Sequence, residues 1–393
     1  MVARRPGQGH ASWAGVPAPA PPLGGNVGAN GLGCMAEDVG RKPGMTSRAL
    51  LLTPSQGLGG GIERYVQTLE WAFAAEGVAC QRLDLSGSGS RAHARLLSRG
   101  RAVLRTESGP VRLVVAHPAL LPVAVLLARS PAVCGMSVIC HGTDVWGSRW
   151  RLRRSLDRRL MRRADVRVVA VSNFTSGAIL RDCRASVLPP TLSREWFDTL
   201  AAAAASRQHR GQGLGLVSAF RLTDWQGKGL PQIVAAVAAL GRADVSLTIC
   251  GSGDPPAGLL RLASQYPWCT LRAGLSDSDL ARELAAADLF VLATKTRSGR
   301  RVLGEGFGLV LLEAQAAGTP VIAPAYGGSR EAYIEGVTGV APTDESAEAL
   351  TRTLHDLLKD PARLAGMRRH AAQWSEQAFT SERYTQLAIQ RLL

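Results

Sequence analysis

Short runs of apolar residues recur along most of the chain, and stretches with the spacing of an amphipathic helix lie between them. In the first half the apolar runs cover residues 49–54, 112–118, 136–141 and 166–172. Runs that are apolar at every position predict strands buried on both faces, as in parallel sheets. The intervening stretches predict helices at residues 62–76, 91–105 and 150–163. This alternation predicts a doubly wound parallel sheet.

A second series of the same kind follows an interruption. Residues 189–213 contain prolines, a run of alanines and several polar residues, which favours a connection between domains. After it, further apolar runs cover residues 214–220, 246–251, 288–294 and 320–324. The predicted fold class is therefore α/β, with two Rossmann-like domains that face each other across a cleft. Ligands of such domains bind at the carboxyl ends of the strands.

This pattern divides the chain into five segments. We expect a disordered N-terminal tail (1–46), a first domain (47–195), a linker (196–213), a second domain (214–375) and a C-terminal helix that packs back on the first domain (376–393). The tail is rich in proline, glycine and alanine and has neither sustained periodicity nor the apolar centre of a signal peptide. Folded sequence begins soon after Met45, so a misassigned start codon is one interpretation of the tail.

The net charge of the chain is +15, which by itself suggests an anionic partner. The 46 basic residues are nearly all arginines, since lysine occurs only at Lys42, Lys228, Lys295 and Lys359. Alanine and glycine are also abundant, so the arginines fit the codon usage of a GC-rich genome. No nucleic-acid-binding motif accompanies the charge. We therefore expect no nucleic-acid partner.

The strongest charge cluster lies in residues 148–163, SRWRLRRSLDRRLMRR. Leu152, Leu156 and Leu160 recur in it at helical spacing. One interpretation is a helix that packs through its leucines and is solvated elsewhere. The other is a surface that binds an anionic acceptor or a membrane. No apolar run has the ~18 residues of a transmembrane helix.

Cysteine usage points to a reducing compartment. The seven cysteines form no CxxC pair and no cluster with zinc spacing, and several lie in apolar runs. We expect reduced thiols in a cytoplasmic protein. The second interpretation of the 148–163 cluster would add peripheral contact with the inner face of the membrane.

Two glutamates frame the segment GEGFGLVLLEAQAAGTPVIAP, residues 304–324. Gly306 and Gly308 allow backbone amides to approach a ligand closely at a helix N-terminus. We expect Glu305 just before the helix and Glu313 on it, and a separation of eight residues predicts that both carboxylates project on roughly the same side. Such a pair suits the hydroxyls of a ribose and of a sugar ring. The alternative is that Glu313 is a solvated residue on an amphipathic helix.

Three further groups of polar residues follow predicted strands. Arg221 and Lys228 lie in one loop and suit a pyrophosphate, although two surface charges are the alternative. Gly60 and Gly61 lead into a helix and form a second candidate phosphate site. His141 follows a strand of the first domain, where a structural and a ligand-binding role are both open.

Motifs of other nucleotide enzymes are missing from these loops. The glycines near residue 60 do not form the dinucleotide fingerprint, because its third glycine position is Ile62. The chain also has no GxxxxGK[ST] loop. Hydride transfer and P-loop chemistry are therefore poorly supported.

Together these residues resemble family 4 of the glycosyltransferases, which has the GT-B fold. The specific match is EGFGLVLLEAQAAGTPVIA, with GGIER, HG, VSNF, the Arg–Lys loop and CGSGD as weaker ones, and the resemblance covers the chain from residue 47 onward. It implies that Arg221 and Lys228 neutralise the donor diphosphate and that Glu313 holds the ribose hydroxyls. It also implies that His141 and the segment Glu305, Gly306, Phe307, Gly308, Leu309 contact the donor sugar, and that Gly60 and Gly61 approach the phosphates.

The resemblance predicts a retaining hexosyltransferase that uses a nucleoside-diphosphate sugar and an unidentified acceptor (a glycolipid, a polysaccharide precursor or a natural product). The second domain would bind the donor nucleotide and the first the acceptor. No metal or other cofactor is expected, because Asp277 and Asp279 open a predicted helix after Ser276 and are better explained by capping. A sugar-nucleotide epimerase and a non-catalytic partner subunit are the alternatives.

Three features depart from the family pattern. Arg221 and Lys228 are farther apart than is usual, PPTLS (189–193) replaces the common Asn-Gly turn, and residues 296–304 form a longer, more basic segment. One interpretation of that segment is that its arginines contact the acceptor or the diphosphate. The other is that they are surface charges in water.

Overall fold

The computed structural model describes residues 48–54, 60–146, 151–207, 213–296, 304–378 and 381–393, without the side chains of 151–154 and 381. All of them belong to one compact unit, Met45–Leu393. The predicted tail (1–46) and most of the basic segment 296–304 lie outside the described residues.

The first half forms a six-stranded sheet in the order β2-β1-β3-β4-β5-β6, and every pairing is parallel. Its strands are β1 (Arg48–Thr53), β2 (Ala79–Asp84), β3 (Val111–Val115), β4 (Val133–Cys140), β5 (Val166–Ala170) and β6 (Ser186–Val187). Its helices are α1 (Gly61–Ala75), α2 (Gly89–Thr106), α3 (Leu121–Leu127), α4 (Thr143–Trp146), α5 (Arg151–Met161) and α6 (Asn173–Ile179), with a short 3-10 helix η1 (Pro118–Leu120).

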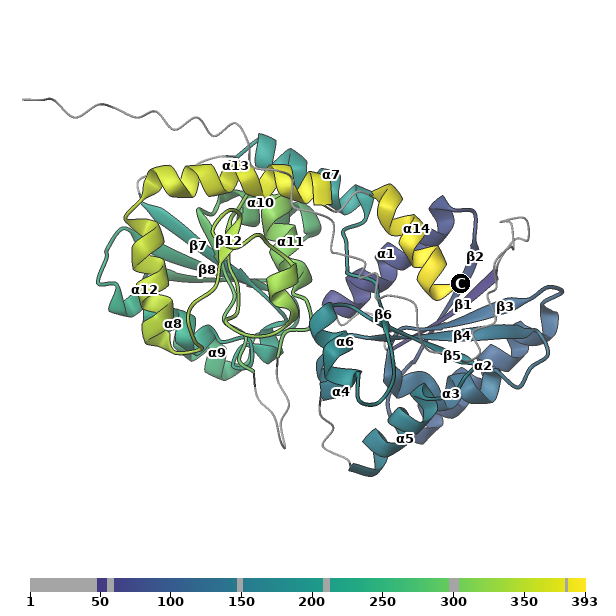
Figure 1. The fold of residues 1–393 in the computed structure, drawn as a ribbon. Helices are drawn as coiled ribbons and strands as arrows, with labels where there is room; N and C mark the ends of the chain where they lie inside the picture. Colours follow the sequence, from purple (N-terminus) through teal and green to yellow (C-terminus); the bar gives the residue numbers. More distant parts are fainter. Residues whose placement is uncertain (1–47, 55–59, 147–150, 208–212, 297–303, 379–380) are drawn as a thin grey trace, which may run out of the picture. The chain divides into compact units, whose positions relative to one another are not determined.

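The second half forms another parallel six-stranded sheet in the order β12-β11-β10-β7-β8-β9 (Figure 1). Its strands are β7 (Leu214–Ala219), β8 (Val245–Gly251), β9 (Cys269–Ala273), β10 (Leu289–Val291), β11 (Val321–Ile322) and β12 (Gly339–Val340). Its helices are α8 (Leu230–Ala239), α9 (Ala257–Ser264), α10 (Asp277–Ala286), α11 (Leu309–Ala316), α12 (Ala347–Leu358) and α13 (Pro361–Ala378), with 3-10 helices η2 (Leu222–Asp224) and η3 (Gly328–Glu331). The predicted α/β fold with two Rossmann-like sheets is confirmed.

The apolar runs predicted as strands all coincide with strands of the two sheets, whereas the four edge strands β2, β6, β9 and β12 were not predicted. Strands β6 and β12 have only two residues each, and the side chains of β2 and β9 are largely half-buried or exposed. An edge strand covered on fewer sides is not apolar at every position, so the search for continuous apolar runs misses it.

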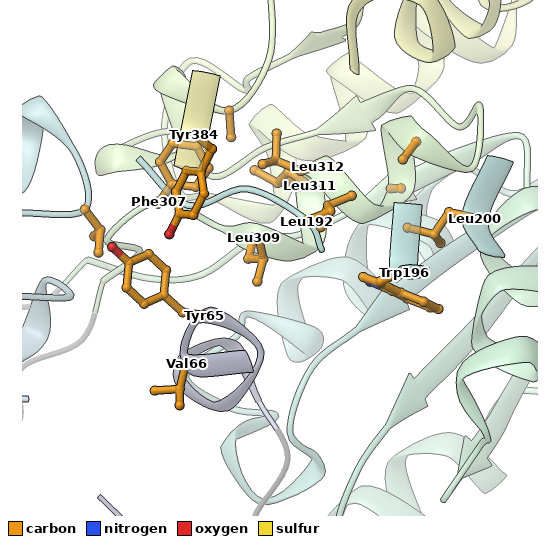
Figure 2. Close-up of a cluster of buried hydrophobic side chains, with 14 of the residues drawn as sticks. Tyr65, Val66, Leu192, Trp196, Leu200, Phe307, Leu309, Leu311, Leu312 and Tyr384 are labelled. Atoms are coloured by element: carbon orange, nitrogen blue, oxygen red, sulfur yellow. The ribbon is translucent and has the colours of Figure 1, made fainter. Parts of the chain in front are cut away.

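Three apolar clusters hold these layers. One lies under α2, α3 and α5 in the first half, and another lies under α8, α12 and α13 in the second. The third joins residues from both halves: Tyr65 and Val66 of α1 share it with Leu311 of α11 and Tyr384 of α14 (Ser381–Leu392). Figure 2 shows its side chains, including Trp196 of α7 (Arg194–Ala205).

Helices α7 and α14 connect the halves. The range predicted as a linker begins within α7, which packs on α10 and α11 of the second half. The predicted C-terminal helix corresponds to α14, which lies beside α1 (Figure 1). Ser137 on β4 donates a hydrogen bond to the carbonyl oxygen of Leu392, with a donor–acceptor distance of 2.8 Å. No helix of the described residues is both long and apolar enough to cross a membrane.

Candidate functional site

The site begins where the strand order of the second sheet changes direction. Strand β7 lies between β8 and β10, so the loops after β7 and β10 leave the sheet on either side of a crevice. The first loop carries Lys228 and the second carries Thr294. The Nζ atom of Lys228 lies 2.8 Å from Oε2 of Glu305, and the hydroxyl of Thr294 donates to the same oxygen at 3.0 Å. The structure thus brings two predicted site residues, Lys228 and Glu305, into contact.

Glycine is required next to Lys228. Gly229 has a φ of +77°, and a Cβ at this position would lie 1.8 Å from the carbonyl oxygen of Ala293. The loop therefore packs directly against the chain that leaves β10, which no larger residue allows. The main-chain amide of Lys228 also donates to the carbonyl oxygen of Asp224 at 3.0 Å. These contacts fix the start of the lysine side chain at the crevice.

Arg221 lies next to Gly60 of the first half. Gly60 has a φ of +137°, and a Cβ on it would lie 2.9 Å from Nη2 of Arg221. Gly60 is the N-cap of α1, and a Cβ on Gly61 would meet nothing within 4 Å. The guanidinium and the N-terminus of a 15-residue helix both carry positive charge, so together they suit a diphosphate.

The segment after Glu305 packs against strand ends of the first sheet. A Cβ on Gly306 would lie 1.8 Å from the carbonyl oxygen of His141, which follows β4. Ser172, which follows β5, donates to the carbonyl oxygen of Gly306 at 2.6 Å. The amide of Gly328 donates to the carbonyl oxygen of Glu305 at 2.8 Å. The predicted sites of the two halves therefore meet at this segment.

His141 is held as a neutral ring. Its Nε2 lies 2.8 Å from the carbonyl oxygen of Ala116, which can only accept, so Nε2 carries the proton. Burial lowers the pKa of the imidazole, and nearby His117 lowers it further, against the opposing effects of Asp144 and of the hydrogen bond to Ala116. The ring of Tyr65 packs on it edge-on, with 5.3 Å between ring centroids. Nδ1 is left as a hydrogen-bond acceptor, which suits a sugar hydroxyl and not the role of a general acid.

The two glutamates lie in different surroundings. Helix α11 begins at Leu309, after Gly308 with a φ of +86°, so Glu305 lies before it and Glu313 lies on it, as predicted. Glu313 is 4% exposed, which shows that the solvated alternative was wrong. Its Oε1 accepts a hydrogen bond from Trp196 at 3.1 Å and lies 3.2 Å from Nε of Arg64. Phe307 and Leu309 are also buried.

Burial has a clear electrostatic effect on Glu313. It raises the pKa of the carboxyl group, while the charge of Arg64 and the hydrogen bond from Trp196 oppose the rise. Arg64 has a raised pKa although its burial acts in the other direction, because Glu313 and Asp277 favour the charged guanidinium. The ion pair with Arg64 therefore favours the charged form of Glu313 against the effect of burial.

Sequence reasoning missed Arg64, Trp196 and Glu331 as residues of this region. The carboxylate of Glu331 accepts hydrogen bonds from the main-chain amides of Asn173 at 2.9 Å and Phe174 at 3.0 Å, at the start of α6. Arg64 lies inside the matched motif GGIER, which was the one available signal. The capping prediction for the acidic pair is confirmed: Ser276 accepts the amide of Asp279 at 3.1 Å.

Two parallel Rossmann-like sheets, with cations and glycines gathered at their carboxyl ends, have the architecture of the GT-B fold. Solved structures with this fold cover most of the chain. Sucrose-phosphate synthase from Thermosynechococcus elongatus superposes with a TM-score of 0.72 at 19% identity, over 88% of this chain and 98% of that one. Anabaena HepE, solved with UDP and glucose, gives a TM-score of 0.67 at 16% identity, over 87% and 98%.

Sequence comparison gives the family. The profile of "Glycosyl transferases group 1" matches residues 211–379. A GDP-mannose-dependent alpha-(1-6)-phosphatidylinositol monomannoside mannosyltransferase of Mycolicibacterium smegmatis is 32% identical over 272 residues, which is 65% of this chain and 70% of that protein. A related mannosyltransferase of Corynebacterium glutamicum, which acts on the monoacylated form, is 40% identical over 154 residues, 38% and 39% of the two chains. The chain belongs to the group 1 glycosyltransferases, in family 4, and is an enzyme that transfers a sugar from a nucleotide donor.

Proposed function

We propose that this enzyme transfers a hexose from a nucleoside-diphosphate hexose to a polar lipid acceptor with retention of anomeric configuration. The observation that carries the proposal is the cationic crevice: Lys228 and Arg221 lie at the switch point of the second sheet, and Gly60 lies directly opposite Arg221. The names of the mannosyltransferase relatives support GDP-mannose as donor and an inositol glycolipid as acceptor.

Charge stabilisation is the main catalytic effect of this arrangement. As the bond from the sugar C1 to the diphosphate oxygen breaks, Arg221 and Lys228 stabilise the negative charge that develops on the leaving group. The acceptor hydroxyl attacks C1 from the same face, and the leaving phosphate oxygen takes its proton. Glu305 is in contact with Lys228 and accepts hydrogen bonds from the sugar hydroxyls. It does not act as the catalytic acid or base of a hydrolase.

His141 and Glu313 complete the donor site in this proposal. The unprotonated Nδ1 of His141 accepts a hydroxyl of the transferred sugar, and the buried carboxylate of Glu313 accepts ribose hydroxyls. Amides of the segment Gly306 to Leu309 face the donor at the N-terminus of α11. Arg221 and Lys228 provide the positive charge that a divalent metal provides in other glycosyltransferases. Sugar transfer should therefore persist in the presence of EDTA.

The decisive experiment is a thermal-shift screen of nucleotides and nucleotide sugars, followed by a transfer assay with the compound that stabilises most. Lys228→Ala should reduce kcat by roughly 100-fold or more, because the leaving diphosphate loses a cation. Glu313→Ala should mainly weaken donor binding.

Two further measurements test the stereochemistry and the metal prediction. NMR of the product reports whether the anomeric configuration is retained, and the same transfer assay in EDTA tests whether a metal is needed.

Lys359→Ala is the matched control, since Lys359 pairs with Asp356 on the remote surface of α12. Wild-type kinetics are expected for it. If Lys228→Ala and Glu313→Ala also retained wild-type transfer kinetics, the assignment of the site would be wrong.

A lipid acceptor also requires contact with a membrane, and we propose the exposed face of α5 for this contact. Of the predicted leucine stripe, Leu160 packs on the core whereas Leu156 is 46% exposed. Leu156 and Arg159 lie three residues apart and share an exposed helix face. An apolar side chain among arginines suits the interface of an anionic bilayer.

A further inference from the structure

Arg64 is the residue on which the contacts between α1, α7, α10 and α11 converge. Its Nε lies 3.2 Å from Oε1 of Glu313 on α11, and its Nη2 lies 2.7 Å from Oδ1 of Asp277 on α10. The guanidinium also stacks over the ring of Trp196, with 4.3 Å from Cζ to the ring centroid. One side chain of the first half thus contacts three residues that lie beyond residue 190.

These contacts differ in strength. Asp277 is largely exposed (64% of its side chain), so water and salt screen that pair. The Glu313 side chain is only 6% exposed, so its partner decides whether it is charged. A buried carboxylate that loses its cation becomes protonated or displaces its surroundings. The Arg64–Glu313 contact is therefore the important one.

The contacts of Glu313 leave one of its carboxylate oxygens available to a ligand. Trp196 and Arg64 both bind the same oxygen, Oε1. An ionised carboxylate has acceptor sites on two oxygens, so Oε2 can accept further hydroxyls while these two contacts persist. Arg64 itself is fixed by the indole face and by Asp277, and it has no need to leave when a donor arrives.

We propose that Arg64 is a positioning residue for donor binding: it holds Glu313 ionised and oriented, so that the carboxylate can receive the ribose hydroxyls. This inference rests on the role proposed above for Glu313. Arg64 belongs to the first half and Glu313 to the second. The ribose site is complete only when the two halves are in contact, which links donor recognition to the approach of His141 and Gly60.

The test compares Arg64→Gln with the wild type, using GDP and 2′,3′-dideoxy-GDP as probes in direct binding measurements. The wild type should bind GDP at least about tenfold more tightly than the dideoxy analogue, because a site built for hydroxyls leaves a buried polar group unpaired without them. Arg64→Gln should lose most of this preference, and its donor KM should rise while its acceptor KM changes little. Arg64→Lys should recover part of the preference, since lysine keeps the charge but not the planar fork.

Two controls separate this role from a purely structural one. Arg242→Gln removes a two-bonded arginine–aspartate pair on the surface of the second half, with distances of 2.9 and 2.6 Å to Asp244, and should behave as the wild type. Combining Arg64→Gln with Glu313→Gln should cost no more donor affinity than Glu313→Gln alone, because both changes disable the same carboxylate.

Several results would overturn the inference. Tighter GDP binding by Arg64→Gln would show that Arg64 competes with the donor for Glu313. If Arg64→Gln weakened the binding of GDP and of its dideoxy analogue by the same factor, the preference would be intact and Arg64 would have a structural role only. If Glu313→Gln itself left the preference unchanged while Arg64→Gln abolished it, the proposed role of Glu313 would fail, and Arg64 would act through another group.

Discussion

Gly306 lies where the candidate sites of the two halves pack directly against each other. It has no side chain to separate the backbone from the carbonyl oxygen of His141, and its own carbonyl oxygen accepts a hydrogen bond from Ser172. At the scale of single residues, the site therefore depends on a missing side chain as much as on its charged ones. Gly60, opposite Arg221, gives a second example.

Gly306→Ala should reduce transfer strongly, by roughly 100-fold, since displacing reacting groups by about 1 Å can cost that much. The added Cβ would stand 1.8 Å from a backbone oxygen of His141, so the two segments must separate. Steady-state kinetics and a thermal melt measure the effect on activity and on stability.

Gly366→Ala is the control, because Gly366 lies within α13 and its nearest neighbour is the end of an arginine side chain. Alanine should stabilise the helix by about 0.5–1 kcal/mol with unchanged kinetics. Activity in Gly306→Ala close to that of the wild type would contradict the close approach of the two segments.

At the scale of secondary-structure elements, helix ends join the halves. Glu331 of η3 accepts amide hydrogens at the first turn of α6, so a residue of the second half caps a helix of the first. A carboxylate at this position satisfies otherwise unpaired amides and interacts favourably with the helix dipole. The capping contact also fixes α6, whose N-cap residue Ser172 binds Gly306.

Glu331→Ala should destabilise the fold by about 1 kcal/mol, the usual cost of a lost cap, and should reduce turnover as well. Chemical denaturation and transfer kinetics provide the two measurements. Ser346→Ala removes the cap of α12, a helix that packs on α8 away from the site. Ser346→Ala should destabilise the fold by a similar amount and leave turnover unchanged. Equal turnover in Glu331→Ala and Ser346→Ala would argue against a role for the α6 contact in transfer.

At the scale of the whole molecule, the distribution of arginine decides what the high net charge means. Many arginines pair locally with carboxylates, as Arg163 does with Asp165 at 2.8 Å and Arg242 with Asp244. Arg158 of α5 also pairs with a carboxylate, that of Asp182, but this helix in addition exposes Leu156 beside Arg159. The charge there is combined with apolar surface, which is typical of interfacial helices.

Vesicles containing anionic phospholipid should therefore co-sediment with the protein at low salt, and binding should fall as salt screens the arginines. Leu156→Glu should weaken binding several-fold, since it places a negative charge at the interface. Leu260→Glu is the matched control: Leu260 is 49% exposed on α9 of the second half. Failure of the wild type to bind anionic vesicles at low salt would exclude this surface.

Sequence by itself determined the alternation of strands and helices and the α/β fold, and it singled out Lys228 and Glu305 as residues near strand ends, whereas only the structure shows that they are in contact. Those predictions depend on local patterns, because burial on both faces makes a central strand apolar throughout and because strand ends collect at one edge of a parallel sheet. Family resemblance then supplied roles for these residues.

Tertiary structure alone decided the environment of Glu313. Its partners Arg64 and Trp196 lie 249 and 117 residues away along the chain, and no periodicity relates positions so distant. Burial and pairing arise only when separate elements pack together, so a charged residue inside an apolar cluster is visible in the sequence while the cation that stabilises it is not.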